Sequence, residues 1–386
     1  MPESAKLPVE YPLYIKIPAI LISICLICFI FKTLEDVFIP LAFAVLISIL
    51  LNPLCSRLQK RVSKVPAILI SILLGILFLV GLFYFMSTQI SGFLNSLPQL
   101  KIKLVALLGD LQVWVQDHFG VDIRQHISSL STELRNGGLT STVGTMLGTL
   151  GVVILIPIYV FMLLYYKPLI LDFLFQVFSE KHSLRVAEVL TQTKSAVQSF
   201  MVGLLIETAI VCVLNSIALL AIGVPSAIVI GIIGGLLNIL PYIGGLIAIT
   251  IPVLMITVVR DGYTGQLLVI AAYLIIQFID NNILVPRIVS SKVQINALIS
   301  IIIVLLGGLL WGISGMFLSI PFVGVLKIIF DRVDDLKPWG RLLGDEVPSE
   351  HSGVVWQKRW DRIFRRMQQK KEIELRTGEG SSPNSL

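Results

Sequence analysis

The chain has 386 residues, of which 55% are hydrophobic and 14% are charged. Soluble domains carry about 25% charged residues, so this composition excludes an ordinary soluble globular protein. The net charge of +6 does not indicate nucleic-acid binding, because Lys and Arg gather in loops beside hydrophobic runs, as they do in membrane proteins. The four cysteines, Cys25, Cys28, Cys55 and Cys212, lie in or beside those runs, which argues against a secreted disulfide framework.

The order of the hydrophobic runs predicts an all-α integral membrane protein. About 20 apolar residues cross the hydrocarbon core of a bilayer as a helix. About eight segments are predicted, at residues 14–31, 37–54, 66–86, 147–166, 199–222, 226–259, 265–283 and 297–330. Between the third and fourth lies a polar stretch, residues 87–145, whose leucines keep a helical spacing. We expect this stretch to form a small helical domain outside the cytoplasm.

Basic residues set the expected orientation. Arg57, Lys60, Arg61 and Lys64 crowd the short loop after the second segment and place that loop in the cytoplasm. Both termini are then cytoplasmic, and the protein is expected to be a multi-pass protein of the inner (plasma) membrane. The expected divisions are residues 1–86, with the first three helices, 87–145 outside, 146–330 as a transport core, and 331–386 as a basic cytoplasmic tail.

Two hydrophobic segments are too long for one crossing. Residues 226–259 and 297–330 each number 34, or about 50 Å as straight helices. Each has a glycine cluster near its middle and an Ile-Pro pair beyond it. We therefore expect two broken, re-entrant hairpins, since irregular backbone at that depth must be buried or line a cavity. Because a spanning helix precedes each, they would form an inverted repeat. The alternative is eight plain crossings, which also leaves both termini inside.

Motifs for enzymatic chemistry are absent from the sequence. It has no phosphate-binding Gly-x-x-x-x-Gly-Lys-Ser/Thr loop, no His-Glu-x-x-His and no Gly-x-Ser-x-Gly. The histidines His118, His126, His182 and His351 have no metal-ligand spacing. We therefore expect neither an enzyme, nor a cofactor, nor a bound metal.

Polar residues within apolar runs are the candidate functional residues. Glu207 lies inside the fifth segment, and Gln277, Asp280, Asn281 and Asn282 end the seventh. An ionisable group at membrane depth is costly and marks function by default, although a carboxylate near the interface or a helix cap is the alternative. Broken helices often bind substrates and ions at the break. The remaining candidates for a substrate or ion pathway are Asn238, Pro241, Tyr242, Gly244, Pro286, Gly307, Gly308, Gly312 and Ser314.

Three successive motifs resemble one known family. They are Gly-Val-Pro-Ser-Ala at 223–227, Leu-Asn-Ile-Leu-Pro-Tyr-Ile-Gly at 237–244, and Gln-Phe-Ile-Asp-Asn-Asn-Ile-Leu-Val-Pro-Arg at 277–287. In this order, with the glycine-rich run at 307–315, they are similar to signatures of the autoinducer-2 exporter-like (AI-2E) permease family over residues 15–332. The chain departs from the family at Gly245, Ser290 and Ala297. The resemblance implies an oligomeric permease; some members are linked to export of autoinducer-2 and others to sodium–proton exchange.

The sequence therefore favours a secondary transporter that moves a small polar solute by alternating access. The solute could be a signalling molecule such as autoinducer-2. A cation–proton antiporter using Asp280 or Glu207 is the alternative within transport, and a membrane scaffold that recruits other proteins is the alternative from another class. Expected partners are a small solute or ion, membrane lipid and further copies of the chain, but no nucleic acid.

The tail carries one further pattern. Five large apolar residues fall on one face of a predicted helix, at Trp356, Trp360, Ile363, Phe364 and Met367, with Lys and Arg between them. The pattern is typical of a helix that lies on an anionic membrane surface. A solvated helix packed against the protein's own cytoplasmic loops is the alternative.

Overall fold

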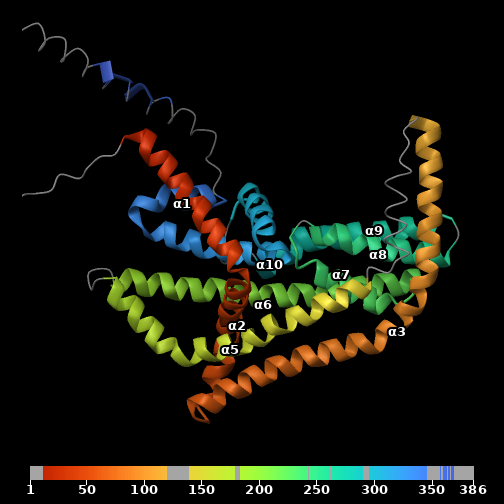
Figure 1. Cartoon of the computed structure of the whole chain (residues 1–386), viewed down its shortest axis with the longest axis horizontal. Coiled ribbons are helices and arrows are strands. Elements are labelled where there is room, and N and C mark those ends of the chain that lie inside the picture. The colour runs from red at the N-terminus through yellow and green to blue at the C-terminus, as the bar shows by residue number, and fades with distance from the viewer. Residues whose placement is uncertain are drawn as a thin grey trace, which may run out of the picture. The chain divides into compact units, whose positions relative to one another are not determined.

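The computed structural model describes residues 12–119, 139–178, 183–241, 243–260, 262–289 and 295–345, with residues 357, 360–362, 364–365 and 367–368 of the tail. The described elements are helices, with no strand among them (Figure 1). Two compact units divide the chain, Met1–Leu343 and Gly344–Leu386. The prediction of an all-α protein is confirmed.

The helices of the first unit contain all eight predicted hydrophobic segments. In chain order they are α1 (Leu13–Thr33), α2 (Glu35–Leu58), α3 (Lys64–Phe119), α5 (Leu139–Val177), α6 (Ser183–Ile222), α7 (Ala227–Leu237), α8 (Ile243–Val259), α9 (Thr264–Ile279), the π-helix η2 (Asp280–Val289), α10 (Ala297–Arg332), the 3₁₀ turn η3 (Asp334–Leu336) and α11 (Lys337–Leu343). Helix α3 runs through residue 86 without a break and continues to Phe119. The limits of the predicted outer domain, residues 87–145, stay a prediction.

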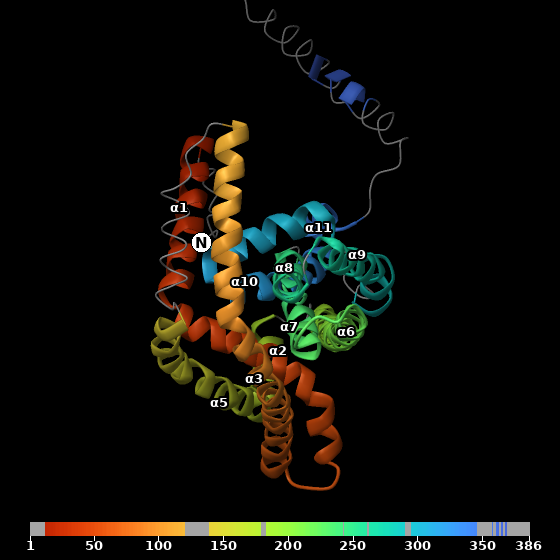
Figure 2. The same ribbon diagram turned by 90° about the vertical axis from the view of Figure 1, so that its right-hand side faces the viewer.

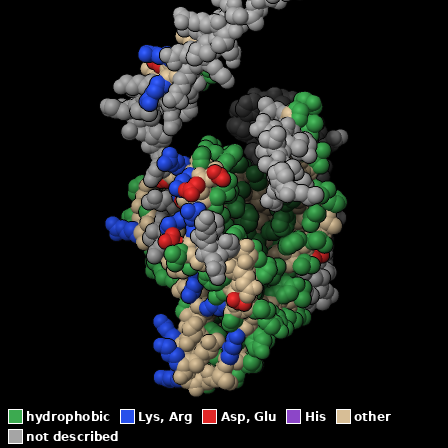
Figure 3. All heavy atoms as spheres, turned by 90° about the vertical axis from the view of Figure 1, so that its left-hand side faces the viewer, with side chains coloured by type: hydrophobic (Ala, Val, Ile, Leu, Met, Phe, Trp, Pro, Cys, Tyr) green, Lys and Arg blue, Asp and Glu red, His purple; other side chains and the backbone are tan. Residues whose placement is uncertain are grey.

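The surface of the first unit suits a bilayer. Six helices within the described residues are long and apolar enough to span a membrane. Large apolar side chains stand exposed on them, such as Phe29, Phe78 and Phe83, each about two-thirds exposed. Figure 3 shows hydrophobic side chains over much of one face and basic side chains at the end where α2 turns into α3. Soluble monomers rarely expose so much contiguous apolar surface, so these helices are membrane-spanning.

Three clusters of buried side chains hold the first unit together. Helices α2, α3 and α5 pack around Ala44, Ile68 and Val160, while α6 to α9 pack around residues that include Leu219 and Met255. A third cluster, with Leu46 of α2, Val197 and Met201 of α6 and Leu318 of α10, connects the two groups. Helices α6 and α10 therefore pack on α2. In Figure 2 the helices α6 to α9 lie together.

The first long segment is broken, as predicted, and folds back as a hairpin. Helix α7 ends at Leu237 and α8 begins at Ile243, and the two halves pack on each other through the α6–α9 cluster. A Cβ at Gly244 would collide with the carbonyl of Leu237, so this turn requires glycine. A Cβ at Gly231 would likewise collide with Ser216 of α6, and one at Gly235 with Cys212. The backbones of α6 and α7 can approach only because these positions lack side chains.

The second long segment is also a hairpin, with its turn at Trp311 and Gly312. Gly312 has φ of 59°, a conformation that favours glycine. Ser319 donates a hydrogen bond of 3.0 Å to the carbonyl of Ile303, although sixteen residues of straight helix would separate them by about 24 Å. The two limbs are closest at Gly307 and Gly315, where either Cβ would collide with the other's carbonyl. The indole of Trp311 donates a 3.0 Å hydrogen bond to the Phe31 carbonyl at the end of α1.

Two ion pairs connect the base of the second hairpin to the start of α6. Arg332 pairs with Glu188 at 2.8 Å and Arg185 with Asp334 at 3.5 Å. The pKa of the Asp334 carboxyl lies below its usual value, because Lys337 donates a hydrogen bond to it and Lys337 and Arg185 are positively charged. These groups are exposed, so each pair contributes little stability.

Replacing Gly315 by alanine should loosen the second hairpin. The added methyl would collide with the Gly307 carbonyl, and overpacking of this kind costs about 1–3 kcal/mol. We expect a lower midpoint of thermal unfolding for the purified protein in detergent. The control is Gly81→Ala in α3, where a Cβ meets nothing within 4 Å; alanine favours helices, so that midpoint should hold or rise. Equal midpoints for Gly315→Ala and the unchanged protein would contradict the tight hairpin.

Candidate functional site

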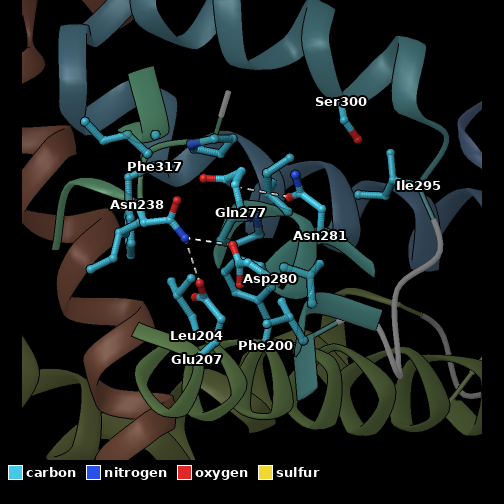
Figure 4. A pocket seen from close by; sticks show the side chains of 18 of the residues that line it. Phe200, Leu204, Glu207, Asn238, Gln277, Asp280, Asn281, Ile295, Ser300 and Phe317 are labelled. Atoms are coloured by element: carbon cyan, nitrogen blue, oxygen red, sulfur yellow. Dashed lines mark hydrogen bonds between the residues drawn. The ribbon is translucent and has the colours of Figure 1, made fainter. Parts of the chain in front are cut away.

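A large cavity of the first unit lies where the two hairpins face α6 and the α9–η2 junction. Its volume is about 650 Å³, within the range of small-molecule sites. Helix α6 contributes Phe200 and Leu204, and the second hairpin contributes Phe317 and Pro321. The wall is largely apolar, and Figure 4 shows Glu207, Asn238 and Asp280 close together, with Gln277 and Asn281 near them and Ser300 apart. The described lining residues include no Lys, Arg or His, so no basic side chain in the wall balances an acidic one.

Three polar side chains from distant segments meet at this cavity. The Asn238 side-chain nitrogen donates hydrogen bonds to Glu207 Oε1 at 2.9 Å and to Asp280 Oδ2 at 2.8 Å (Figure 4). Glu207 and Asp280 are each 3% exposed. Two buried carboxyl groups thus share the two N–H groups of one amide. Burying carboxyl groups without a basic partner in the described wall is costly, so this cluster is the candidate site of the first unit.

Local breaks in the helices place these three residues. Asn238 is the first residue after α7, where the chain leaves the helix for the hairpin turn. Asp280 begins the π-helix η2, directly after α9. Short π-helical stretches often occur at functional sites, and η2 is a π-helix of ten residues. Glu207 belongs to the regular helix α6, which packs closely on η2, since a Cβ at Gly203 would collide with the Ile288 carbonyl. The cluster therefore joins three separately built segments.

A much smaller cavity lies next to the cluster. Its volume is about 10 Å³, and it is lined by residues that include Asn215, Asn238, Tyr273, Gln277 and Asp280. Asn215 Oδ1, the Tyr273 hydroxyl and Asp280 Oδ1 are buried and have no hydrogen-bond partner among the described residues. A space of this size holds about one water molecule or a small ion. Oxygen atoms that can accept are in excess here, an arrangement that favours a small donor or a cation.

Six of the predicted residues line the large cavity: Glu207, Asn238, Pro241, Gln277, Asp280 and Asn281. Tyr242 lies outside the described residues, and the remaining candidates do not line the cavity. Asn282 is exposed and donates to the Phe278 carbonyl in its own helix, and Pro286 is also exposed.

The predicted glycines shape the hairpins instead. Gly244 and Gly307 are at close backbone contacts, Gly308 lies against Met316, and Gly312 forms the turn. Ser314 is half-buried beside that turn.

The sequence analysis missed several lining residues. Asn215 and Tyr273 line the small cavity, and Ser300 and Phe317 line the large one. Asn215 and Tyr273 sit in apolar runs as single polar residues, the same signal that pointed to Glu207. A helical spacing provides a second signal: Glu207, Val211 and Asn215 are four residues apart, which places them on one face of α6.

Membrane-length helices around a buried cavity with two broken hairpins define a membrane protein of the transport type. The sequence profile of the AI-2E family transporter matches residues 19–335. The chain belongs to this family, which confirms the resemblance noted in its motifs.

Curated relatives share most of their length with this chain. The putative transport protein YueF of Bacillus subtilis is 26% identical over 342 residues, covering 82% of this chain and 90% of YueF. The AI-2 transport protein TqsA of Escherichia coli is 26% identical over 319 residues, covering 80% of this chain and 90% of TqsA. The putative permease PerM of E. coli is 40% identical over 65 residues, or 17% of this chain. The relatives support a permease-type membrane transporter.

Asn238→Ala should destabilise the protein more than a matched change nearby. It removes the donor to both carboxyl groups, and each buried group left unsatisfied costs about 1–3 kcal/mol. We expect a clear drop in the midpoint of thermal unfolding in detergent. Asn282→Ala is the control, because that exposed amide bonds only to its own helix. If both variants unfold at the same temperature, the Asn238 bridge is not a significant structural contact.

Proposed function

We propose that the chain is a secondary transporter that carries a small polar solute through the 650 Å³ cavity by alternating access. The observation that carries this proposal is the buried Glu207–Asn238–Asp280 cluster on the wall of that cavity. Autoinducer-2 is the first solute to test, since the relative TqsA is named for its transport. The mostly apolar wall leaves the cluster, with Gln277 and Asn281, to hydrogen-bond a polar solute.

The carboxyl pair is the proposed point of energy coupling. Two acidic groups lie together in apolar surroundings, and the described wall contains no basic residue. A proton arriving at either carboxyl would change the hydrogen bonds of Asn238, and Asn238 sits at the turn of the first hairpin. Proton binding and movement of that hairpin would then be linked.

The two hairpins are the proposed moving parts. Both contribute to the cavity wall, Asn238, Pro241 and Gly245 from the first and Phe317, Pro321 and Gly324 from the second. If they enter the membrane from opposite sides, as the inverted repeat predicts, each can close one route to the cavity. Helices α1 to α3 and the predicted outer domain would then serve as the scaffold and as the surface for contact between copies of the chain.

Asp280→Asn and Glu207→Gln test the coupling, because they keep the size and remove the charge. In vesicles of purified protein with an imposed proton gradient, we expect the gradient-driven part of autoinducer-2 flux to fall at least tenfold in each variant. Asp335→Asn is the control, since it removes an exposed acidic group outside the cavity. Unchanged flux and unchanged response to the gradient in Asp280→Asn would refute coupling at the pair. A panel of other small polar solutes in the same assay identifies the substrate if autoinducer-2 is inert.

A cation–proton antiporter is the second candidate function, and the small cavity favours it. This cavity has space for one small ion. Its lining residues include Asn215, Tyr273 and Asp280, and each has one buried oxygen atom with no hydrogen-bond partner among the described residues. In vesicles without solute, addition of Na⁺ or K⁺ would then drive proton movement, which a pH-sensitive dye detects. Asn215→Leu and Tyr273→Phe should reduce that signal. Flux of neither solutes nor cations would instead favour the membrane scaffold.

Single cysteines at positions 260 and 292, in a chain without its four natural cysteines, test the topology. The inverted repeat predicts position 260 outside and position 292 in the cytoplasm. An impermeant thiol reagent should label position 260 in intact cells and position 292 only after lysis. The reverse pattern would support eight plain crossings with both termini inside.

A further inference from the structure

The tail beyond Leu343 is a separate unit, and the proposed transport cycle does not use it. Its described residues between 357 and 368 are helical. Trp360, Phe364 and Met367 are 63%, 56% and 64% exposed. Their spacing of four and three residues puts them on one side of that helix. The second unit thus presents a row of large apolar side chains to its surroundings.

The charge around this row has one sign. Residues 356–371 contain seven Lys or Arg and a single acidic residue, Asp361. Arg362 and Arg365 are exposed within the described part. A helix with an apolar face and a strongly basic remainder is suited to the boundary between headgroups and acyl chains of an anionic bilayer. Tryptophan also prefers that boundary, because its ring is apolar and its N–H is polar.

We propose that this helix binds the anionic lipid surface of the membrane in which the protein is embedded. The apolar row would insert at headgroup level, and the basic residues would lie near the lipid phosphates. The proposal does not depend on what the cavity transports.

The test uses the full-length protein in nanodiscs, without its natural cysteines and with one environment-sensitive fluorophore. The label is placed at position 364, on the apolar row, or at position 361, outside it. In nanodiscs with about one-third anionic lipid, the label at 364 should shift to the blue and the label at 361 should not. In purely zwitterionic nanodiscs the shift at 364 should be absent. About 1 M salt should reduce it, since the Debye length falls to about 3 Å.

A charge variant separates electrostatic binding from simple apolar insertion. Replacing Arg362, Arg365 and Arg366 by Gln removes three charges, each contributing about fivefold to binding at an anionic surface. We expect most of the blue shift at position 364 in the one-third anionic nanodiscs to be lost, while solute flux persists. An equal shift in anionic and zwitterionic nanodiscs, or equal behaviour of the labels at 364 and 361, would overturn the proposal. The first result would indicate apolar insertion without an electrostatic contribution or packing on the protein's own loops, and the second a helix without a membrane-facing side.

Discussion

Two buried carboxyl groups, with no basic partner among the residues that the structure describes, are the constraint on which the rest of this fold depends. The Glu207 and Asp280 side chains come from α6 and η2 and meet only because Asn238 donates to both. Asn238 reaches both carboxyl groups from the break between α7 and α8, because it is the first residue after α7 ends. The hairpin, the π-helix and the close approach of α6 to η2 at Gly203 all serve to bring these three groups together in an apolar interior.

Most of the architecture was predictable from the sequence, because the bilayer limits what a chain can do. Segments of 34 residues exceed one crossing, so both had to break, and the glycine clusters correctly indicated where. The length of α3 was not predictable in the same way. The predicted limit at residue 86 marks a change from apolar to polar composition, and such a change does not by itself end a helix, since the leucines beyond it keep a helical spacing.

The site was predictable in part. Charged and amide residues inside apolar runs were the strongest signal, and five of them line the cavity: Glu207, Asn238, Gln277, Asp280 and Asn281. Glycines were chosen by a different argument, that helix breaks often bind substrates, yet Gly307 and Gly312 close and turn the hairpin instead. Phe317 could not have been found, because one more aromatic residue in a hydrophobic run carries no signal of its own. Only the fold decides whether such a ring faces lipid, core or cavity.

The turn of the second hairpin is held by the first helix of the chain. Trp311 bonds to the Phe31 carbonyl, and their rings meet edge to face at 5.9 Å. A few residues on, Phe43 of α2 stacks at 5.5 Å on Phe317, which lines the cavity. Aromatic contacts thus connect α1 to the turn of the second hairpin, and α2 to the cavity wall. Substitutions in α1, far from the cavity in sequence, can therefore shift the second hairpin and change the shape of the cavity without touching the carboxyl pair.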